Sequence, residues 1–415
     1  MAERMAKGNG VSGIVVIGAG QAGASLVARL RAEGHGGEIT LIGAEPVPPY
    51  QRPPLSKGYL LGELPVERLF LRPTSFYDEH GIVLKLGTEA VAVDRAARQV
   101  ALADGERLAY DQLVLTTGSR PRRLPEAVGG GLDGVFTVRT LADVDAMAPT
   151  MTAGARALIV GGGYIGLEAA AVARKLGLQV TLVEMAERIL ARVACAETAA
   201  WFRALHRSKG VDLREGVGLE RLEGGPGVTG AVLSDGSRIA ADLVIVGIGV
   251  APDTRLATAA GLAVENGIAV DAMGRTSEPA VWAAGDCTSF PWQGGRIRLE
   301  SVQNAIDQAE CVARNLAGAA EPYRPQPWFW SDQYDVKLQI AGLNAGYDRV
   351  AVRPGARDGT VSHWYYRGGV LVSVDAMNDP RAYMAGKRLI EAGLSPAPSV
   401  IGDPAQDLRT LLAAG

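Results

Sequence analysis

The sequence predicts an α/β protein with parallel sheets, on three observations. Short β-rich apolar runs alternate with helical patterns over about the first 330 residues. The order strand, glycine cluster, helix occurs twice, at residues 14–28 and 158–170. From about Pro322 the pattern changes to closely spaced strand signals. Alternating strands and helices indicate parallel sheets with right-handed crossovers, and the last stretch indicates a small separate α+β domain.

The first repeat begins with "IVVIGAG", a short apolar strand that ends in glycine. "ASLVARLRAEG" follows with helical spacing and a glycine stop. "EITLIGAE" predicts a second strand. "DQLVLTTGSRP" predicts a further buried strand, which ends at the glycine and proline of that segment.

The second repeat restarts this plan at "ARALIVGGG", continues with the helix "LEAAAVARKLG" and reaches the strand "QVTLVE". "ADLVIVGIGVAPD" predicts a closing buried strand. "AVWAAGD" predicts one more strand, and the helical run "ESVQNAIDQAECVARNLAG" comes after it.

The last part opens with "YRPQPWFWSDQ", whose prolines and aromatic residues predict a linker and domain entry. Strands are expected at "VKLQIAGL" and "DRVAVR". "VSHWYYRGGVLVSVDAM" predicts a hairpin that turns at Gly368–Gly369. "DPRAYMAGKRLIEAG" predicts a late helix, which completes the α+β domain.

The composition limits the class of protein. A chain of 415 residues is expected to form two or three domains, and 47% hydrophobic with 21% charged residues is typical of soluble globular proteins. The net charge of −3 argues against nucleic acid as a general partner. No apolar run approaches the roughly 20 residues that span a bilayer. The start, "MAERMAKGNGVSG", lacks the apolar segment of a secretory signal and is expected to be a frayed tail. We therefore expect a cytoplasmic protein without a membrane partner.

The cysteines exclude several chemistries. Cys195, Cys287 and Cys311 lie far apart in the sequence, and none belongs to a C-x-x-C motif. Neither a zinc ribbon nor a redox dithiol is indicated, and we expect no metal site. A sparse, odd set of thiols is typical of a reducing compartment.

The first glycine cluster matches the G-x-G-x-x-G pattern in Gly18, Gly20 and Gly23, between a predicted strand and a predicted helix. The first glycine permits a tight turn, the second lets the backbone approach a pyrophosphate, and the third lets helix and strand pack closely. The pyrophosphate would lie on the free N–H groups of the helix N-terminus. A Rossmann-like dinucleotide-binding domain is predicted here.

Gly161, Gly163 and Gly166 repeat this pattern and predict a second such domain. Glu184 ends the following strand, where a carboxylate accepts from a ribose 2′-hydroxyl and repels a 2′-phosphate. We therefore expect NAD rather than NADP at the second site.

In the first repeat, the acid that corresponds to Glu184 does not end the second strand: "EITLIGAE" has Gly43 and Ala44 before Glu45. Either Glu45 or the backbone alone would bind the adenosine ribose there. Two dinucleotides in one chain suggest a hydride relay between a diffusible nicotinamide and a resident, non-covalent flavin.

Eight motifs in order, covering essentially the whole chain, resemble the FAD-dependent NADH:ferredoxin reductases of oxygenase systems, the putidaredoxin reductase-like family. They are "IGAGQAG", "PPYQRPPLSKGYL", "LVLTTGSRPR", "VGGGYIGLEAA", "DLVIVGIGVAPDT", "AVWAAGDC", "RLESVQNAIDQAE" and "PWFWSDQY". The resemblance implies a glutathione-reductase-like fold. Its parts would be an FAD domain of residues 11–118 and 251–325, an NAD domain of 119–250 and a C-terminal domain of 326–415.

The resemblance also implies site residues. FAD would contact Gly18, Gly20, Ala22, Gly23, Arg52, Lys57, Ala90, Arg139, Asp286 and Val302. NAD would contact Gly161, Gly163, Tyr164, Ile165, Gly166, Glu184 and Gly249. Ala44 departs from the family, whose members often carry an acid there, and this leaves the part played by Glu45 open.

Three residues are candidates for a direct part in the reaction. The resemblance places Lys57 and Glu168 together near flavin N5; otherwise they are a surface lysine and an ordinary helical glutamate. Trp330 is either a lid over the nicotinamide, an electron-exit surface, or core packing. Tyr164 either shields the flavin until NADH displaces it or packs at a domain interface.

The function follows from the family and from one absence. No cysteine precedes Cys195, so the redox thiols that disulfide reductases and NADH peroxidases need near "PPLSKGYL" are missing. The resemblance implies transfer from NADH through FAD to a [2Fe–2S] ferredoxin, which supplies a cytochrome P450 or a ring-hydroxylating dioxygenase.

The alternatives are a rubredoxin reductase and a redox-gated interaction protein resembling apoptosis-inducing factor. The small C-terminal domain, without long insertions, favours the enzyme. A basic docking patch for the ferredoxin would draw on Arg296, Arg298, Arg314 and Lys387.

Overall fold

The computed structural model describes residues 13–412, so the predicted frayed tail lies outside the described residues except for Gly13, which begins a strand. The chain divides into two compact units. The first unit contains the chain up to Gln51, Val66–Arg120 and Ala251–Pro325. The second contains Arg52–Pro65, Pro121–Val250 and the chain from Gln326 onwards. The predicted boundaries of three domains stay a prediction.

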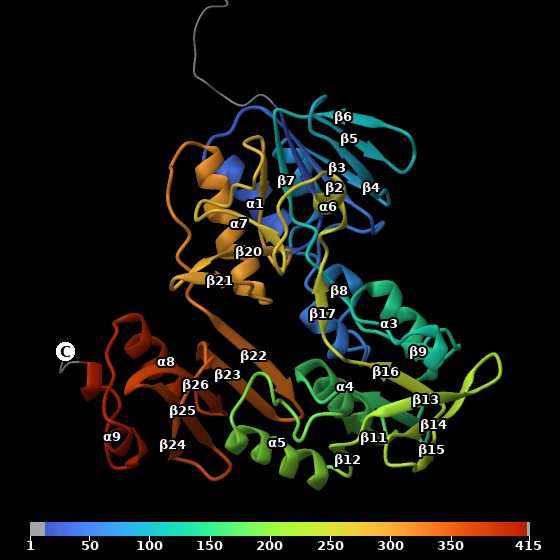
Figure 1. Ribbon diagram of the computed structural model, residues 1–415, viewed down its shortest axis with the longest axis vertical. Coiled ribbons are helices and arrows are strands. Elements are labelled where there is room, and N and C mark those ends of the chain that lie inside the picture. Colours follow the sequence, from blue (N-terminus) through green and yellow to red (C-terminus); the bar gives the residue numbers. More distant parts are fainter. Residues whose placement is uncertain (1–12, 413–415) are drawn as a thin grey trace, which may run out of the picture. The chain divides into compact units, whose positions relative to one another are not determined.

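A five-stranded parallel sheet with the order β19-β7-β1-β2-β3 forms the centre of the first unit (Figure 1). Helices α1 and α7 pack against each other and against this sheet through a core that includes Val16, Leu26 and Val312. The bounds are β1 (Gly13–Ile17), α1 (Gln21–Ala32), β2 (Glu38–Gly43), β3 (Ile82–Leu86), β7 (Gln112–Leu115), β19 (Val281–Ala283) and α7 (Val302–Leu316). The predicted parallel α/β arrangement is confirmed here.

Smaller elements complete the first unit. A three-stranded antiparallel sheet consists of β4 (Ala90–Asp94), β5 (Gln99–Leu102) and β6 (Arg107–Ala109). A second small sheet consists of β18 (Ile268–Ala269), β20 (Thr288–Trp292) and β21 (Gly295–Ile297). The short helices are α2 (Thr74–Glu79) and α6 (Arg255–Ala259). The chain passes between the units at β8 (Ser119–Pro121) and β17 (Val250–Pro252).

The second unit contains another parallel sheet, of order β12-β11-β10-β16-β9. Its bounds are β9 (Val135–Phe136), β10 (Arg156–Val160), β11 (Gln179–Glu184), β12 (Asp212–Glu215) and β16 (Leu243–Val246). The helices of this part are α3 (Leu141–Met147), α4 (Tyr164–Lys175) and α5 (Ala196–Ser208). The strands β13 (Leu219–Gly224), β14 (Val228–Leu233) and β15 (Arg238–Ala240) form an antiparallel sheet.

An antiparallel sheet of order β22-β23-β26-β25-β24 ends the second unit. Its bounds are β22 (Trp328–Gln333), β23 (Val336–Gly342), β24 (Arg349–Pro354), β25 (Val361–Arg367), β26 (Val370–Met377), α8 (Pro380–Glu391) and α9 (Pro398–Gly402). The predicted hairpin at Gly368–Gly369 is confirmed, and both glycines have the positive φ of such a turn.

The expectation of a linker across "YRPQPWFWSDQ" is wrong from Trp328 onwards, where the chain forms β22. The prolines Pro325 and Pro327 precede the strand and do not interrupt its ladder with β23. Aromatic residues favour strands, and an edge strand needs only one partner. The aromatic cluster is therefore part of the C-terminal sheet.

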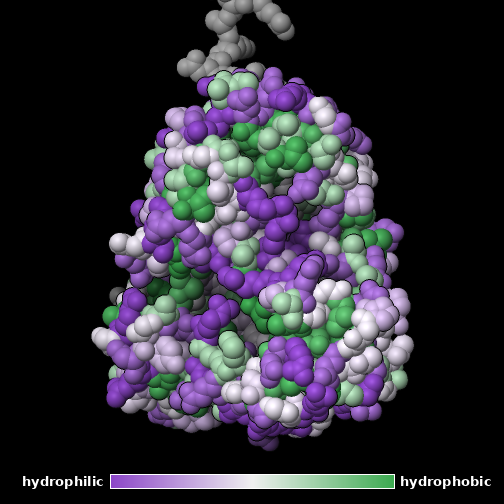
Figure 2. All heavy atoms as spheres, turned by 45° about the vertical axis from the view of Figure 1, so that its right-hand side comes forward, coloured by the Kyte–Doolittle hydropathy of each residue, from purple (hydrophilic) through white to green (hydrophobic). Residues whose placement is uncertain are grey.

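Within residues 13–412 no helix is both long enough and apolar enough to cross a bilayer. Figure 2 shows a largely hydrophilic face on which hydrophobic residues gather in several groups, one of them near the top of the view.

Candidate dinucleotide sites

The first glycine loop lies between β1 and α1, and two of its glycines are required by the protein itself. Gly18 has φ +116°, and a Cβ there would lie 2.2 Å from the carbonyl oxygen of Thr116. A Cβ at Gly23 would lie 2.1 Å from the carbonyl oxygen of Gly18. Gly20 differs, because its φ is −97° and no protein atom lies within 4 Å of the Cβ position. Neither strain nor packing demands glycine at position 20, so the open space fits a pyrophosphate against the backbone.

The second loop, between β10 and α4, repeats these relations. Gly161 has φ +110°, with a Cβ position 2.5 Å from the carbonyl oxygen of Gly247. A Cβ at Gly166 would lie 2.0 Å from the carbonyl oxygen of Gly161. Gly163, like Gly20, has ordinary φ and nothing within 4 Å. The second loop therefore also fits a dinucleotide.

The helices that follow the two glycine loops, α1 and α4, differ from the other long helices in how their N-termini are capped. Among the described residues, α5, α7 and α8 have N-caps whose side chains accept a backbone N–H, namely Cys195, Ser301 and Asp379. α1 and α4 begin after Gly20 and Gly163 and have no side-chain cap. Free N–H groups and the positive end of the helix dipole attract phosphate. The two glycine loops thus leave their helix N-termini open to an anionic ligand.

Glu184 is the last residue of β11, as the sequence predicts. Its Oε2 accepts from the N–H of Gly162 at 2.7 Å and its Oε1 accepts from the N–H of Ala186 at 2.8 Å. The carboxylate is therefore held against the second glycine loop, with lone pairs left for a further donor.

Glu45 is placed differently, two residues beyond the end of β2. Its Oε2 accepts from the hydroxyl of Tyr50 at 2.6 Å. Glu45 thus bonds to the segment that follows β2, whereas Glu184 bonds to its own glycine loop, so the two acids are not equivalent in geometry.

Asp286 follows β19 and lies at the same sheet edge as the first loop, because parallel strands share their carboxyl edge. Its Oδ2 accepts from Ser119 Oγ at 3.0 Å. Gly285 has φ +86°, and its Cβ position lies 3.0 Å from the Cβ of Ala22. This close approach brings the Asp286 turn against the start of α1.

Two other residues predicted to contact FAD in the first unit begin elements. Val302 is the first residue of α7, directly after its cap Ser301, and Ala90 is the buried first residue of β4. The structure therefore gives both a fixed backbone position, and their contacts to a cofactor stay a prediction.

Arg52 and Arg139 meet in the second unit, where Arg52 Nη1 donates to the carbonyl oxygen of Arg139 at 2.5 Å. Arg139 precedes the capping box of α3, in which Thr140 and Asp143 bond reciprocally. The backbone N–H of Arg139 also donates to Asp143 Oδ2, at 3.0 Å. The cap fixes the segment that Arg52 contacts.

Lys57 and Glu168 are brought together in the second unit, with Lys57 Nζ 3.1 Å from Glu168 Oε1. A second carboxylate was missed by the sequence analysis: Asp332 Oδ2 lies 3.3 Å from the same Nζ. Ser331 Oγ donates to Glu168 Oε1 at 2.8 Å, and Ser56 Oγ donates to Glu168 Oε2 at 3.4 Å. Burial raises the pKa of Glu168, while the Lys57 ammonium opposes the shift. The cluster is one cation between a buried and a partly exposed carboxylate.

Tyr164 begins α4, and its ring packs 5.0 Å from that of Phe329 on β22. Its hydroxyl is buried and has no hydrogen-bond partner among the described residues. Tyr164 therefore packs on the C-terminal sheet within the second unit, and its part in binding NAD stays a prediction. Trp330 is half-buried, with its ring 5.5 Å from that of Trp328, and its functional part stays a prediction.

Exposed apolar side chains adjoin the second loop. Ile165 is 42% exposed, as expected for a ligand contact, and Ile248 is 37% exposed. Met185, directly after Glu184, is 81% exposed. Gly249, with φ +95°, accepts from the N–H of Arg122 through its carbonyl at 2.9 Å. Met185 and Ile248 adjoin the predicted contacts Glu184 and Gly249 in the sequence.

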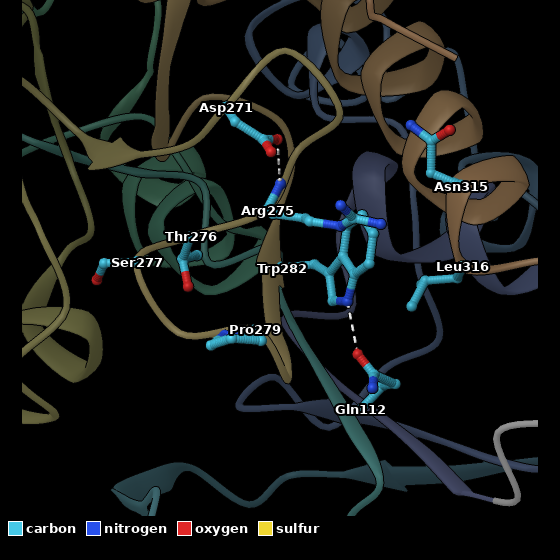
Figure 3. Close-up of a pocket in the computed structure, with 9 residues that line it drawn as sticks. All are labelled: Gln112, Asp271, Arg275, Thr276, Ser277, Pro279, Trp282, Asn315 and Leu316. Atoms are coloured by element: carbon cyan, nitrogen blue, oxygen red, sulfur yellow. Dashed lines mark hydrogen bonds between the residues drawn. The ribbon is translucent and has the colours of Figure 1, made fainter. Parts of the chain in front are cut away.

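A surface pocket of about 510 Å³ lies elsewhere in the first unit (Figure 3). Gln112, the first residue of β7, places it at the amino end of the parallel strands, away from the glycine loop. Arg275 lies over the indole of Trp282 at 5.0 Å, and Trp282 Nε1 donates to Gln112 Oε1 at 2.6 Å. Asp271 accepts from backbone N–H groups, including that of Arg275. The pocket contains none of the predicted site residues.

The basic residues proposed for docking all have intramolecular partners. Arg298 pairs with Glu300, Arg314 with Glu321 and Lys387 with Glu391. Arg296 donates to the carbonyl oxygen of Val270 at 2.9 Å. These contacts give no support to a shared docking patch.

All three cysteines are buried and unpaired. Burial raises the pKa of Cys287 to about 11, so its thiol stays protonated near neutral pH. No dithiol stands beside either glycine loop.

Comparison with known proteins agrees with this geometry. Residues 12–309 match the family described as pyridine nucleotide-disulphide oxidoreductase, and residues 328–412 match a reductase C-terminal family. A ferredoxin–NAD(P)+ reductase of Sphingomonas sp is 46% identical over 96% of this chain and 97% of its own length. Putidaredoxin reductase of Pseudomonas putida is 41% identical over 98% of both chains.

Among solved structures, the covalent putidaredoxin reductase–putidaredoxin complex has a TM-score of 0.94 at 41% identity, and covers 98% of this chain and 99% of its own. A persulfide reductase of A. fulgidus, at 24% identity and a TM-score of 0.87, shares the fold. The chain therefore belongs to the pyridine nucleotide-disulphide oxidoreductase family and is a flavoprotein oxidoreductase of its ferredoxin reductase group.

Proposed function

We propose that this protein is an NADH-dependent ferredoxin reductase, which passes electrons through FAD to a [2Fe–2S] ferredoxin that supplies a cytochrome P450 or a ring-hydroxylating dioxygenase. The observation that carries the proposal is the pair of open loops at Gly20 and Gly163, in a chain similar over its whole length to ferredoxin reductases. When bound, FAD accepts a hydride from the nicotinamide and gives up its two electrons one at a time.

The first loop would hold FAD. The N–H groups at the start of α1 would bind the pyrophosphate, and the Asp286 carboxylate would accept from the ribityl chain. The other residues of this site would be Gly18, Ala22, Gly23, Arg52, Ala90, Arg139 and Val302. Glu45 accepts from Tyr50 at 2.6 Å and has lone pairs left, so either Glu45 or the backbone would bind the adenosine ribose.

The second loop would hold NADH. The Glu184 carboxylate is anchored by two backbone N–H groups, and it would accept from the 2′-hydroxyl of the adenosine ribose. A 2′-phosphate would meet the same negative charge at short range, and this supports a preference for NADH over NADPH. Ile165 and Gly249 would line the remaining length of the dinucleotide.

Lys57 would donate to the flavin ring edge at N5 and help to position the nicotinamide. Its pairing with Glu168 supports a held orientation, because hydride transfer moves no separate proton and needs neither residue as an acid or base. Trp330, half-buried on β22, would adjoin this region as a lid or electron-exit surface.

The test has two stages. The purified protein should be yellow, release FAD on denaturation, and be reduced faster by NADH than by NADPH in a stopped-flow experiment. Cytochrome c reduction is then measured with each ferredoxin of the host and with a rubredoxin. A rate that no [2Fe–2S] ferredoxin increases would remove the proposal.

Rubredoxin is the second candidate acceptor. A rubredoxin–NAD+ reductase of Pseudomonas putida is 38% identical over 89% of this chain. An increase by rubredoxin alone would favour that activity over ferredoxin reduction.

A further inference from the structure

Lys57 is the only cation that the structure places against Glu168, and it serves two carboxylates within the described residues. Its Nζ lies 3.1 Å from Glu168 Oε1 and 3.3 Å from Asp332 Oδ2. The side chains are 19% exposed for Lys57, 10% for Glu168 and 42% for Asp332. The ammonium therefore lies between a buried acid and one that faces solvent.

One strand supplies most of this arrangement. Successive side chains of β22 point to opposite faces, so Trp330 and Asp332 share one face and Ser331 lies on the other. Ser331 Oγ and the backbone N–H of Asp332 both donate to Glu168 Oε1, at 2.8 and 3.3 Å. Residues 331 and 332 thus hold the Glu168 carboxylate, while the Asp332 carboxylate takes the ammonium.

An ammonium has three N–H donors in a tetrahedral arrangement. Two contacts of fixed direction, to Glu168 and to Asp332, determine where the third N–H points. With Glu168 alone the side chain would rotate about a single contact. The four-carbon stem of lysine is flexible, so this second contact has a large effect on orientation.

We propose that Asp332 is a positioning residue that fixes the Lys57 ammonium, so that its third N–H is directed at flavin N5. The inference rests on the proposed placement of Lys57 beside the flavin. Asp332 acts only through Lys57 and stays on the solvent side of it.

The test uses the FAD-bound protein and four variants. Asp332→Asn keeps the size of the side chain and removes its charge. Asp335→Asn is the matched control, because it removes the same charge from the same β22–β23 hairpin. The Asp335 side chain is 81% exposed, and its Oδ1 lies 3.9 Å from Lys209 Nζ. Lys57→Met removes the donor, and Asp332→Glu restores a carboxylate.

The first readout is the ¹⁵N resonance of flavin N5, which reports a hydrogen bond to that atom. We expect D332N to move the resonance from the position of the unmodified protein towards that of K57M. D335N should leave it in place, and D332E should return it most of the way. A resonance unchanged in D332N overturns the inference.

The second readout is the titration of Glu168, followed by ¹³C-labelled glutamate. In D332N, Lys57 pairs with Glu168 alone and one negative charge is gone, so the raised pKa of Glu168 should fall. D335N should not change it. A Glu168 pKa that is the same in D332N and the unmodified protein overturns the inference, even if D332N binds FAD poorly.

The experiment distinguishes failure of this inference from failure of the proposed function. An N5 resonance that K57M does not move would show that Lys57 does not reach the flavin, which overturns the inference but leaves ferredoxin reduction untouched. Expected shifts in a protein that reduces no ferredoxin would support the inference and remove the proposed function.

Discussion

The two glycine loops share a plan and differ at one strand end. β1 pairs with β2, and β10 pairs with β11, in the same register: Ile17 faces Ile42, and Val160 faces Val183. The next residue of each second strand is Gly43 in the first sheet and Glu184 in the second, so these two positions correspond. A Cβ at Gly43 would lie 2.7 Å from the Cβ of Ala19, the second residue of the first loop. A Cβ at Gly162, the same position of the second loop, would lie 3.2 Å from the Cβ of Glu184.

In the first site, the alanine within the loop requires glycine at the strand end. In the second site, the glycine within the loop leaves room for Ile189, whose Cγ2 would lie 2.6 Å from an added Cβ, and for the Glu184 side chain. The first site therefore cannot hold its acid where the second does, and Glu45 lies further along, bonded to Tyr50. The NADH preference that we propose would depend on the acid at the second strand end, while the outer glycines serve packing in both sites.

The largest expected effect is at the packing glycines. Gly23→Ala and Gly166→Ala each place a Cβ about 2 Å from a backbone carbonyl oxygen that has little room to move. We expect each to lower the free energy of unfolding by roughly 3 kcal/mol or more, or to prevent folding. Urea denaturation followed by circular dichroism measures this loss. Stability within about 0.5 kcal/mol of the unmodified protein would show that the loops relax freely.

Substitution of the middle glycines, Gly163 and Gly20, should have the opposite effect: it should weaken ligand binding and leave stability nearly unchanged. In Gly163→Val the added Cβ meets no protein atom within 4 Å, and the φ of −80° is allowed for valine. We expect nearly unchanged stability and at least tenfold weaker NADH binding, about 1.4 kcal/mol, since the side chain fills the pyrophosphate space. Titration calorimetry on the FAD-bound protein measures the affinity. Gly20→Val is the companion variant, and it should spare NADH binding in any protein that retains FAD.

Substitution of the two acids, Glu184 and Glu45, should have different effects on nucleotide preference. Glu184→Gln removes the charge that opposes a 2′-phosphate, so the preference for NADH over NADPH in kcat/KM should fall by roughly tenfold. Glu45→Gln should leave that ratio unchanged, because Glu45 belongs to the other site. Equal kcat/KM values for the two nucleotides in the unmodified protein would refute the part given to Glu184.

The smallest effect concerns the anchors at the helix starts. Gln21 begins α1 and donates only to Ser25, whereas Tyr164 begins α4 with a buried hydroxyl that lacks a partner within residues 13–412. Tyr164→Phe should raise the free energy of unfolding by about 1 kcal/mol, because an unsatisfied polar group is removed. A decrease would indicate that a buried water bonds the hydroxyl. Tyr164→Leu is the control for ring packing on Phe329.

The same region gives a pH dependence. Burial raises the pKa of Asp375 to about 6, although Tyr365 and Thr198 donate to it. A carboxyl whose pKa is higher in the folded than in the unfolded state stabilises the fold below about pH 4, and this contribution is lost as the pH rises to 6. Asp375→Asn should flatten the slope of stability between pH 4 and 6. An identical slope in both proteins would contradict the shift.

The sequence was sufficient for the parallel sheets, the two loops and the C-terminal hairpin, because glycine spacing and apolar runs are local signals. It was not sufficient for β22, whose strand depends on pairing with β23. It also missed Asp332, since residues 57, 168 and 332 meet only in the folded unit. The close approach of Gly43 to Ala19 is likewise a contact between two elements, which cannot be predicted from either sequence segment alone.

Anaerobic titration of the purified protein with NADH, followed by the visible spectrum of the flavin, tests whether the chain binds both dinucleotides. We expect bound FAD that bleaches with one equivalent of NADH, because the first loop would hold FAD and the second loop would hold NADH. A colourless protein that cannot be reconstituted with FAD, or a flavin spectrum that NADH does not change, would contradict it.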